Sequence, residues 1–209
     1  MSRNRRLIFV AGNIVIVVWE IVALTLRIAH EQQNMLTYFT VLSNLFALIA
    51  CAVCTLFALH GKYLVTLYSW ATYLLAFAFA VPLVGASTQE GGYYKLFLVG
   101  EDFVNHLACP VAMVSIYFTC LPKAINTDGA ILAIGTILLY GTTMYMLNAF
   151  GVVYGPYFFF EVHSYTLGQI LLMLIVLVAM ATLLSLTLYA LKMQEKRTTV
   201  VENCVTSSK

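Results

Sequence analysis

The sequence predicts an all-α membrane protein in which six transmembrane helices form one bundle. The first observation is composition: 62% of the 209 residues are hydrophobic and only 10% are charged. A water-soluble domain could not bury that much apolar surface, so lipid must be most of its solvent. The second observation is length, because six apolar stretches reach the roughly 20 residues that cross a bilayer. They are residues 7–26, 36–59, 64–84, 103–121, 130–150 and 167–191.

The connections between these stretches are short and rich in turn-forming residues, at 60–62, 85–92, 122–129 and 151–156. No soluble domain fits between them, so residues 1–209 are predicted to be a single transmembrane domain. The first stretch follows the basic run 3–6, as a signal peptide would. Its apolar region is too long, however, and it contains Glu20 and lacks a small-x-small cleavage site. It is therefore expected to be an anchor that stays in the protein.

Lysine and arginine residues set the expected orientation, because cytoplasmic loops carry an excess of them. With the amino terminus in the cytoplasm, nine of these residues lie inside and two lie outside: Arg3, Arg5, Arg6, Lys62, Lys123, Lys192, Lys196, Arg197 and Lys209, against Arg27 and Lys95. Both termini are therefore predicted to be cytoplasmic. The membrane would be the cell membrane of a bacterium, or the endoplasmic reticulum or plasma membrane of a eukaryote.

Charge and cysteine content limit the partners and cofactors. A net charge of +2 is too small to indicate nucleic-acid binding, and the basic tail from Lys192 is expected to contact anionic lipid headgroups. The five cysteines lie in or at the inner side of helices, so no disulfide framework is predicted. Cys51 and Cys54 form a CxxC pattern, but no helix N-terminus is near to lower a thiol pKa. Only one of the four histidines lies at membrane depth, which disfavours haem, and we expect no cofactor or metal.

Polar residues gather on one side of the membrane in this arrangement, whereas the inner halves hold mostly Leu, Ala, Val and Ile. This asymmetry predicts one polar pocket that opens toward the outer leaflet. The residues concerned are Glu20, Arg27, His30 and Glu31 of the first helix, Thr37, Thr40, Ser43 and Asn44 of the second, Glu101, Asp102, Asn105 and His106 of the fourth, and Tyr154, Glu161 and His163 before the sixth.

The turn around His106 is expected to be irregular. Pro110 has no amide N–H, so in an α-helix the carbonyl of His106 loses its partner, and a freed carbonyl in a membrane must be satisfied locally. An intramembrane carboxylate such as Glu20 marks function by default. Plainer roles exist for each residue: Thr40 could bond the preceding turn, Glu20 could join two helices, and His106 could be an interfacial hydrogen-bonding group.

Three segments resemble a known family. They are residues 38–45 (YFTVLSNL), Asn105-His106 followed by Pro110, and residues 154–163 (YGPYFFFEVH). Together they resemble the androgen-induced-gene and ADTRP-like membrane family and its bacterial six-helix relatives. The resemblance implies an intramembrane threonine hydrolase of fatty acid esters of hydroxy fatty acids, with Thr40 and His106 at the catalytic positions. This chain departs from the family in having Ser43 and Asn44 where an acidic residue follows the threonine.

The implied chemistry assigns a role to several side chains. Thr40 Oγ1 would be the nucleophile and His106 the base that accepts its proton. Glu20, Glu101 or Asp102 would orient the imidazole, and Asn44 or Asn105 would donate to the developing oxyanion. Glu161 and His163 are further candidates, from the loop before the sixth helix. The substrate would be a lipid ester that enters from the outer leaflet.

Two other function classes remain open. A transporter or channel for a small solute or lipid would use Glu20, Arg27, Asn44 and Asn105 to line a path, although the helices lack the paired Gly/Pro breaks typical of transport sites. A non-catalytic lipid-binding protein could keep this fold without the activity, which the substitutions at Ser43 and Asn44 would permit. A pocket closed toward the cytoplasm favours the enzyme, and a polar track reaching the cytoplasm favours transport.

Overall fold

The computed structural model describes residues 2–30, 34–86, 91–121, 127–154, 157 and 160–207, and the side chains among them except at 85 and 195–207. Over these residues the chain is helical and contains no strand, which confirms the all-α prediction. Its elements are α1 (Arg3–Ala29), η1 (Met35–Thr37), α2 (Phe39–Leu59), α3 (Val65–Gly85), α4 (Gly92–Phe97), α5 (Gly100–Phe103), the π-helical turn η3 (Val104–Ala108), α6 (Cys109–Thr119), α7 (Asp128–Ala149), η5 (Val162–Ser164) and α8 (Leu167–Ser207).

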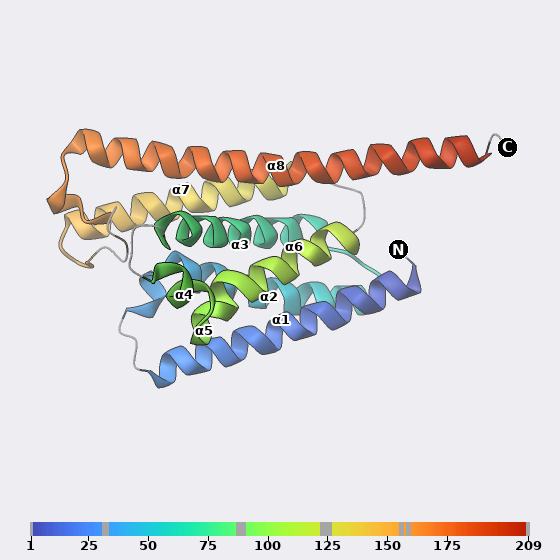
Figure 1. Ribbon diagram of the computed structural model, residues 1–209, viewed down its shortest axis with the longest axis horizontal. Helices are drawn as coiled ribbons and strands as arrows, with labels where there is room; N and C mark the ends of the chain where they lie inside the picture. Colours follow the sequence, from blue (N-terminus) through green and yellow to red (C-terminus); the bar gives the residue numbers. More distant parts are fainter. Residues whose placement is uncertain are drawn as a thin grey trace.

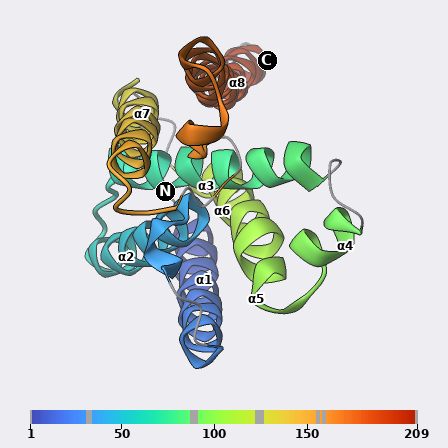
Figure 2. The ribbon, with the colours of Figure 1, turned by 90° about the vertical axis from the view of Figure 1, so that its left-hand side faces the viewer.

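Helix α3 is the centre of the bundle and packs against α2, α6, α7 and α8. Seen end-on, α3 passes between α7 and α8 on one side and α1 and α2 on the other (Figure 2). Gly129 at the start of α7 permits a close approach to α3, because a Cβ at this position would lie 2.8 Å from the Cβ of Ser69. The two termini lie at the same end of the bundle, and the turn after α1 and the segment between α7 and α8 lie at the other end (Figure 1).

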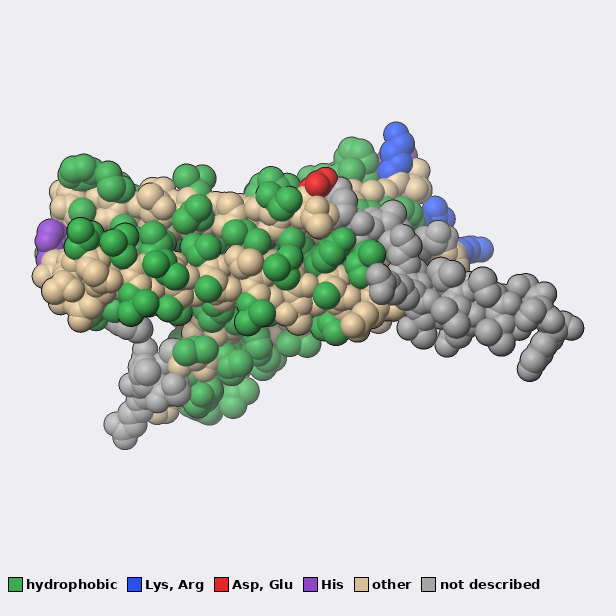
Figure 3. All heavy atoms as spheres, turned by 90° about the horizontal axis from the view of Figure 1, so that it is seen from above, with side chains coloured by type: hydrophobic (Ala, Val, Ile, Leu, Met, Phe, Trp, Pro, Cys, Tyr) green, Lys and Arg blue, Asp and Glu red, His purple; other side chains and the backbone are tan. Residues whose placement is uncertain are grey.

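Five helices in the described part of the chain are long and apolar enough to cross a membrane: Arg3–Ala29, Phe39–Leu59, Val65–Val84, Asp128–Ala149 and Leu167–Gln194. Much of their apolar surface faces outward, including Leu139 and Leu183. On the face seen in Figure 3, hydrophobic side chains run along the bundle, whereas the visible Lys and Arg side chains lie at one end. These features fit a membrane-embedded protein. The predicted helix at 103–121 differs, because three consecutive helical segments, α5, η3 and α6, replace a single α-helix.

The π-helical turn explains this difference. In a π-helix each amide donates to the carbonyl five residues earlier, and the Cys109 amide donates to the carbonyl of Val104. The carbonyl opposite the missing N–H of Pro110 is then that of Asn105. The break in the helix is where expected, and the carbonyl of Asn105 accepts a hydrogen bond from Nδ2 of Asn44 at 3.1 Å. The sequence-based prediction named the carbonyl of His106, and for that carbonyl it stays a prediction.

The end of the bundle that holds the termini is more polar inside than the sequence predicts. The hydroxyl of Tyr68 donates to Oδ1 of Asn13 at 3.1 Å, and the hydroxyls of Tyr73 and Tyr117 lie 2.8 Å apart, all buried. Lys192 was expected among lipid headgroups, but its side chain is buried and its Nζ donates to the carbonyl of Phe118 at 2.6 Å. This carbonyl is in the last turn of α6, where no helical N–H is available to it.

Candidate functional site

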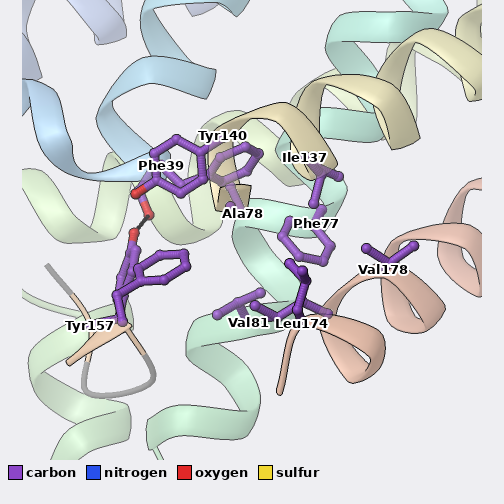
Figure 4. Close-up of a pocket in the computed structure, with 13 residues that line it drawn as sticks. Phe39, Phe77, Ala78, Val81, Ile137, Tyr140, Tyr157, Leu174 and Val178 are labelled. Atoms are coloured by element: carbon purple, nitrogen blue, oxygen red, sulfur yellow. Dashed lines mark hydrogen bonds between the residues drawn. The ribbon is translucent and has the colours of Figure 1, made fainter. Parts of the chain in front are cut away.

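An apolar pocket lies between the beginning of α2 and helices α3, α7 and α8 (Figure 4). It is a narrow cavity of about 30 Å³, room for about two water molecules. Its walls are aromatic and aliphatic, and the hydroxyl groups of one threonine and two tyrosines are its polar members. The lining residues are Phe39, Thr40, Phe77, Ala78, Val81, Ile137, Tyr140, Gly141, Tyr157, Phe160, Leu174, Leu177 and Val178.

Thr40 marks the polar end of this pocket. It is buried in the first turn of α2, and its Oγ1 lies 3.4 Å from the hydroxyl of Tyr157. No side chain caps α2, and the amide N–H groups of Phe39 and Thr40 face the same Tyr157 hydroxyl. Burial raises the pKa of Tyr157 above its ordinary value, so its phenol stays protonated. The first turn of α2 thus presents two amides and a hydroxyl to one oxygen atom, where the positive end of the helix dipole favours electron-rich groups.

His106 is buried behind one wall of the pocket. Its Nδ1 lies 3.4 Å from the carbonyl of Ala78, a residue that lines the pocket on α3. Its Nε2 lies 3.8 Å from Oδ1 of Asp102, which also accepts a hydrogen bond from Arg27 Nη2. Both ring nitrogens therefore face oxygen acceptors other than Thr40. Of the three carboxylates considered for orienting the imidazole, Asp102 is the one that the structure brings near it, and Arg27 of α1 donates to Asp102.

Asn44 joins the turn that carries Thr40 to the turn that carries His106. Its Nδ2 donates to the carbonyl of Thr40 at 2.8 Å and to the carbonyl of Asn105 at 3.1 Å. Because both neighbours are acceptors, the orientation of the amide is unambiguous and both of its N–H groups are used. Asn44 therefore has no N–H left for an oxyanion in this structure, and the donor role expected for it stays a prediction. Asn44 instead supplies the donor that the carbonyl of Asn105 lacks beside Pro110.

A second, smaller pocket lies beside the first, between α1 and α2. Its cavity of about 10 Å³, room for about one water molecule, is lined by Glu20, Leu24, Arg27, Val41, Asn44, Leu45, Leu48 and Asn105. Glu20 and Asn44 are 3% and 2% exposed, so their carboxyl and amide groups lie inside the protein. Oε1 of Glu20 and Oδ1 of Asn44 are among the buried side-chain atoms without a hydrogen-bond partner in the described part of the chain. The predicted polar region therefore divides into this pocket and the one at Thr40.

The two candidates from the loop before α8 lie apart from both pockets. Glu161 is exposed, and His163 is exposed with its Nε2 3.2 Å from the carbonyl of Asn148 at the end of α7. Neither residue lines a pocket. His163 instead approaches the carbonyl end of a helix, which a histidine side chain commonly does. Glu31, also expected in the polar region, lies outside the described residues.

Sequence reasoning missed the two tyrosines of the apolar pocket. Tyr140 lies in the predicted span at 130–150, and neither it nor Tyr157 was among the candidate site residues. Tyr157 instead contacts the first turn of α2, and the hydroxyl of Tyr140 donates to the carbonyl of Thr37 at 2.6 Å. The signal that could have revealed them is the absence of Ser, Thr, Asp or Asn at position 38, which leaves the amides of α2 in need of acceptors from elsewhere.

No family model matches the sequence, and no curated protein or solved structure is significantly similar to it.

Proposed function

We propose that the chain is an integral membrane protein that crosses the bilayer six times, with both termini in the cytoplasm. Five crossings are the long apolar helices. The fourth is the continuous helical backbone from residue 100 to residue 119, which at 1.5 Å per residue rises about 30 Å, the thickness of the hydrocarbon layer. Support comes from the termini lying at one end of the bundle (Figure 1) and from the distribution of Lys and Arg along the sequence.

We further propose that the protein is an intramembrane hydrolase of lipid esters, such as fatty acid esters of hydroxy fatty acids, with Thr40 as the nucleophile. The observation that carries this proposal is the position of Thr40 Oγ1, at the polar end of a pocket that is otherwise nearly all apolar. Apolar walls suit an acyl chain, which would enter as the lining side chains move apart, and its ester group would lie against the first turn of α2. The amides of Phe39 and Thr40 that face the Tyr157 hydroxyl are then the donors for the ester carbonyl oxygen.

In the proposed reaction, the ester carbonyl replaces the hydroxyl of Tyr157 at α2. Thr40 Oγ1 attacks the carbonyl carbon while its proton passes to His106, and the amides of α2 stabilise the oxyanion. Proton transfer requires the imidazole to turn from the Ala78 carbonyl toward α2. The intermediate then expels the alkoxide, which takes the proton from His106. His106 then accepts a proton from water as the water attacks the acyl–Thr40 ester, and it returns this proton to Thr40 Oγ1 as the fatty acid leaves.

The test is turnover of a lipid ester by purified Thr40→Ala and His106→Ala proteins. Loss of either member of a nucleophile–base pair is expected to lower kcat by at least about 10³-fold, whereas Thr40→Ser retains measurable turnover because it keeps a hydroxyl. Thr72→Ala is the matched control, since Thr72 is a buried threonine that bonds the carbonyl of Tyr68 and does not line the pocket. Undiminished turnover in both Thr40→Ala and His106→Ala would remove the mechanism.

A second candidate is a lipid-binding protein without catalytic activity. The observation that favours it is that the hydrogen-bonding neighbour of Thr40 Oγ1 is Tyr157, while the imidazole nitrogens of His106 face Ala78 and Asp102. The same proteins distinguish the two functions. If wild-type protein retains a fatty acid or ester in the pocket but releases no product, and if Thr40→Ala binds it equally well, the binding function holds and the hydrolase is rejected.

A further inference from the structure

The apolar pocket has a polar end and an apolar end. The polar end is the first turn of α2, where Thr40 Oγ1 and the hydroxyl of Tyr157 lie 3.4 Å apart. Figure 4 shows Tyr157 on one side of the pocket and Ile137 and Val178 on the other. A ligand whose polar group lies at Thr40 therefore has its apolar part directed toward Ile137 and Val178.

The direction of the helices agrees with this view. Helix α7 runs away from the end of the bundle that holds the termini, and α8 runs back toward that end (Figure 1). Among the lining residues, Ile137 lies four positions before Gly141 in α7, and Val178 lies four positions after Leu174 in α8. Ile137 and Val178 are therefore about one helical turn, or about 6 Å, nearer the termini than Gly141 and Leu174.

The pocket does not continue beyond Ile137 and Val178. About one turn closer to the termini, α7 carries Ala133 and α8 carries Ala181, which are 0% and 1% exposed and do not line the pocket. Side chains as small as a methyl group are covered so completely only where neighbouring segments pack closely. Ile137 and Val178 thus form the floor of the pocket.

The two floor residues can yield less than the leucines of the wall. A β-branched side chain in a helix has one strongly preferred χ1 rotamer, so Ile137 and Val178 cannot swing aside without cost. Leu174 and Leu177 of α8 are only half-buried and are not branched at Cβ. A chain that enters as the lining side chains move apart can therefore displace these leucines, but it stops at the floor.

We propose that Ile137 and Val178 determine the acyl-chain length that the pocket accepts, with the terminal methyl group of the bound chain lying against them. This inference rests on the acyl occupant of the proposed function and adds the residues that select among substrates. A shorter chain leaves apolar surface uncovered, and a longer chain collides with a fixed side chain. Binding is strongest for one chain length and falls about four-fold for each methylene group that is missing.

The test measures binding apart from catalysis, by thermal unfolding of the purified full-length protein in detergent micelles with free fatty acids from hexanoate to palmitate. A fluorogenic maleimide reports unfolding, because Cys51, Cys54, Cys109 and Cys120 are buried in the folded protein. A fatty acid that binds the folded protein raises its Tm. Each variant is compared with the wild type at the same acid and concentration, so the partitioning of the acid into micelles is the same for both.

Variants of the floor are expected to shift the preferred chain length in opposite directions. Val178→Ala removes two methyl groups, so the best-bound chain should lengthen by about two methylene groups. Ile137→Val should lengthen it by about one, and Val178→Phe should shorten it. Val176→Ala is the matched control, because Val176 is a valine of the same helix that is 54% exposed and does not line the pocket. The Tm without fatty acid shows that each variant is folded.

The outcomes separate this inference from the hydrolase. It is overturned if no fatty acid raises the Tm of the wild type, or if Val178→Ala and Ile137→Val keep the wild-type preference. Turnover of the p-nitrophenyl esters of the same acids is measured in parallel. A preference that shifts with the floor variants while no ester is turned over supports the inference and rejects the hydrolase, and turnover with an unshifted preference does the reverse.

Discussion

At the scale of single residues, two buried polar side chains of this protein contact backbone carbonyls near a helix break or a helix end. Asn44 donates to the carbonyl of Asn105 beside Pro110, and Lys192 donates to the carbonyl of Phe118 near the end of α6. Such carbonyls must be satisfied inside the protein, because the hydrocarbon layer contains no water to bond them. These side chains thus fix where helix ends and breaks sit against neighbouring helices.

The stabilisation given by such a contact can be measured at Lys192. Its Nζ lies over the rings of Tyr117 and Phe118 as well as next to the Phe118 carbonyl, and a cation is favourable at the negative end of α6. We expect Lys192→Met to lower the free energy of unfolding by about 2 kcal/mol, the usual effect of losing a charge-assisted hydrogen bond. The measurement is an SDS unfolding titration in mixed micelles. Leu191→Met, a change at the exposed neighbour, should leave the midpoint unchanged, and an equal midpoint for Lys192→Met would show that the contact is energetically neutral.

The burial of a residue could be predicted from the sequence, whereas its side-chain contacts could not. The burial of Glu20, Thr40 and His106 follows from their places within apolar stretches, because residues there cannot reach bulk water. Which atoms meet depends instead on helix rotation and on local spacing. Asn44 was expected to donate to a substrate, yet its amide bonds two carbonyls, because one missing N–H at Pro110 creates an acceptor that composition does not reveal.

At the scale of helices, the long apolar segments are predictable and the interruptions are not. The run lengths place α1, α2, α3 and α7 to within a few residues, since about 20 apolar residues are enough to define a crossing. The short helix α4 and the π-helical turn η3 carry no comparable signal. A π-turn depends on a shift of one residue in hydrogen-bond spacing, which leaves the hydrophobic pattern almost unchanged.

The link between η3 and α2 can be tested with a double-mutant cycle. Asn44→Ala leaves the carbonyl of Asn105 without a donor and should cost about 1–3 kcal/mol of unfolding free energy. Pro110→Ala restores an amide N–H that can take the place of Asn44, so in this background the cost of Asn44→Ala should fall by about 1 kcal/mol. Unfolding of the four purified proteins in detergent gives the coupling. Ser43→Ala is the control, because Ser43 Oγ donates to Thr40 and not to Asn105. Additive costs for Asn44 and Pro110 would mean that the two do not share this carbonyl.

At the scale of the whole molecule, the two pockets lie on opposite sides of the α2–η3 contact. Helices α3, α7 and α8 bound the apolar pocket, which Thr40 lines, and α1 bounds the polar pocket, which Asn44 lines. Asn44 also joins the turn of η3 to the turn of Thr40, because its amide donates to the carbonyl of Thr40. A ligand in either pocket therefore acts on the same first two turns of α2. This arrangement allows binding in the two pockets to be linked energetically, since a ligand in either would stabilise the same contact.

The orientation of the bundle gives a prediction for the entire chain. Lys62 lies in the turn between α2 and α3, Tyr154 lies after α7 and is 95% exposed, and three proposed crossings separate them. With cytoplasmic termini, a membrane-impermeant maleimide added to intact cells should label Tyr154→Cys, and should label Lys62→Cys only after the membrane is opened. The four described cysteines are buried, so a Cys204→Ser background is sufficient. The reverse pattern would place the termini outside, and labelling of both positions in intact cells would rule out an odd number of crossings between them.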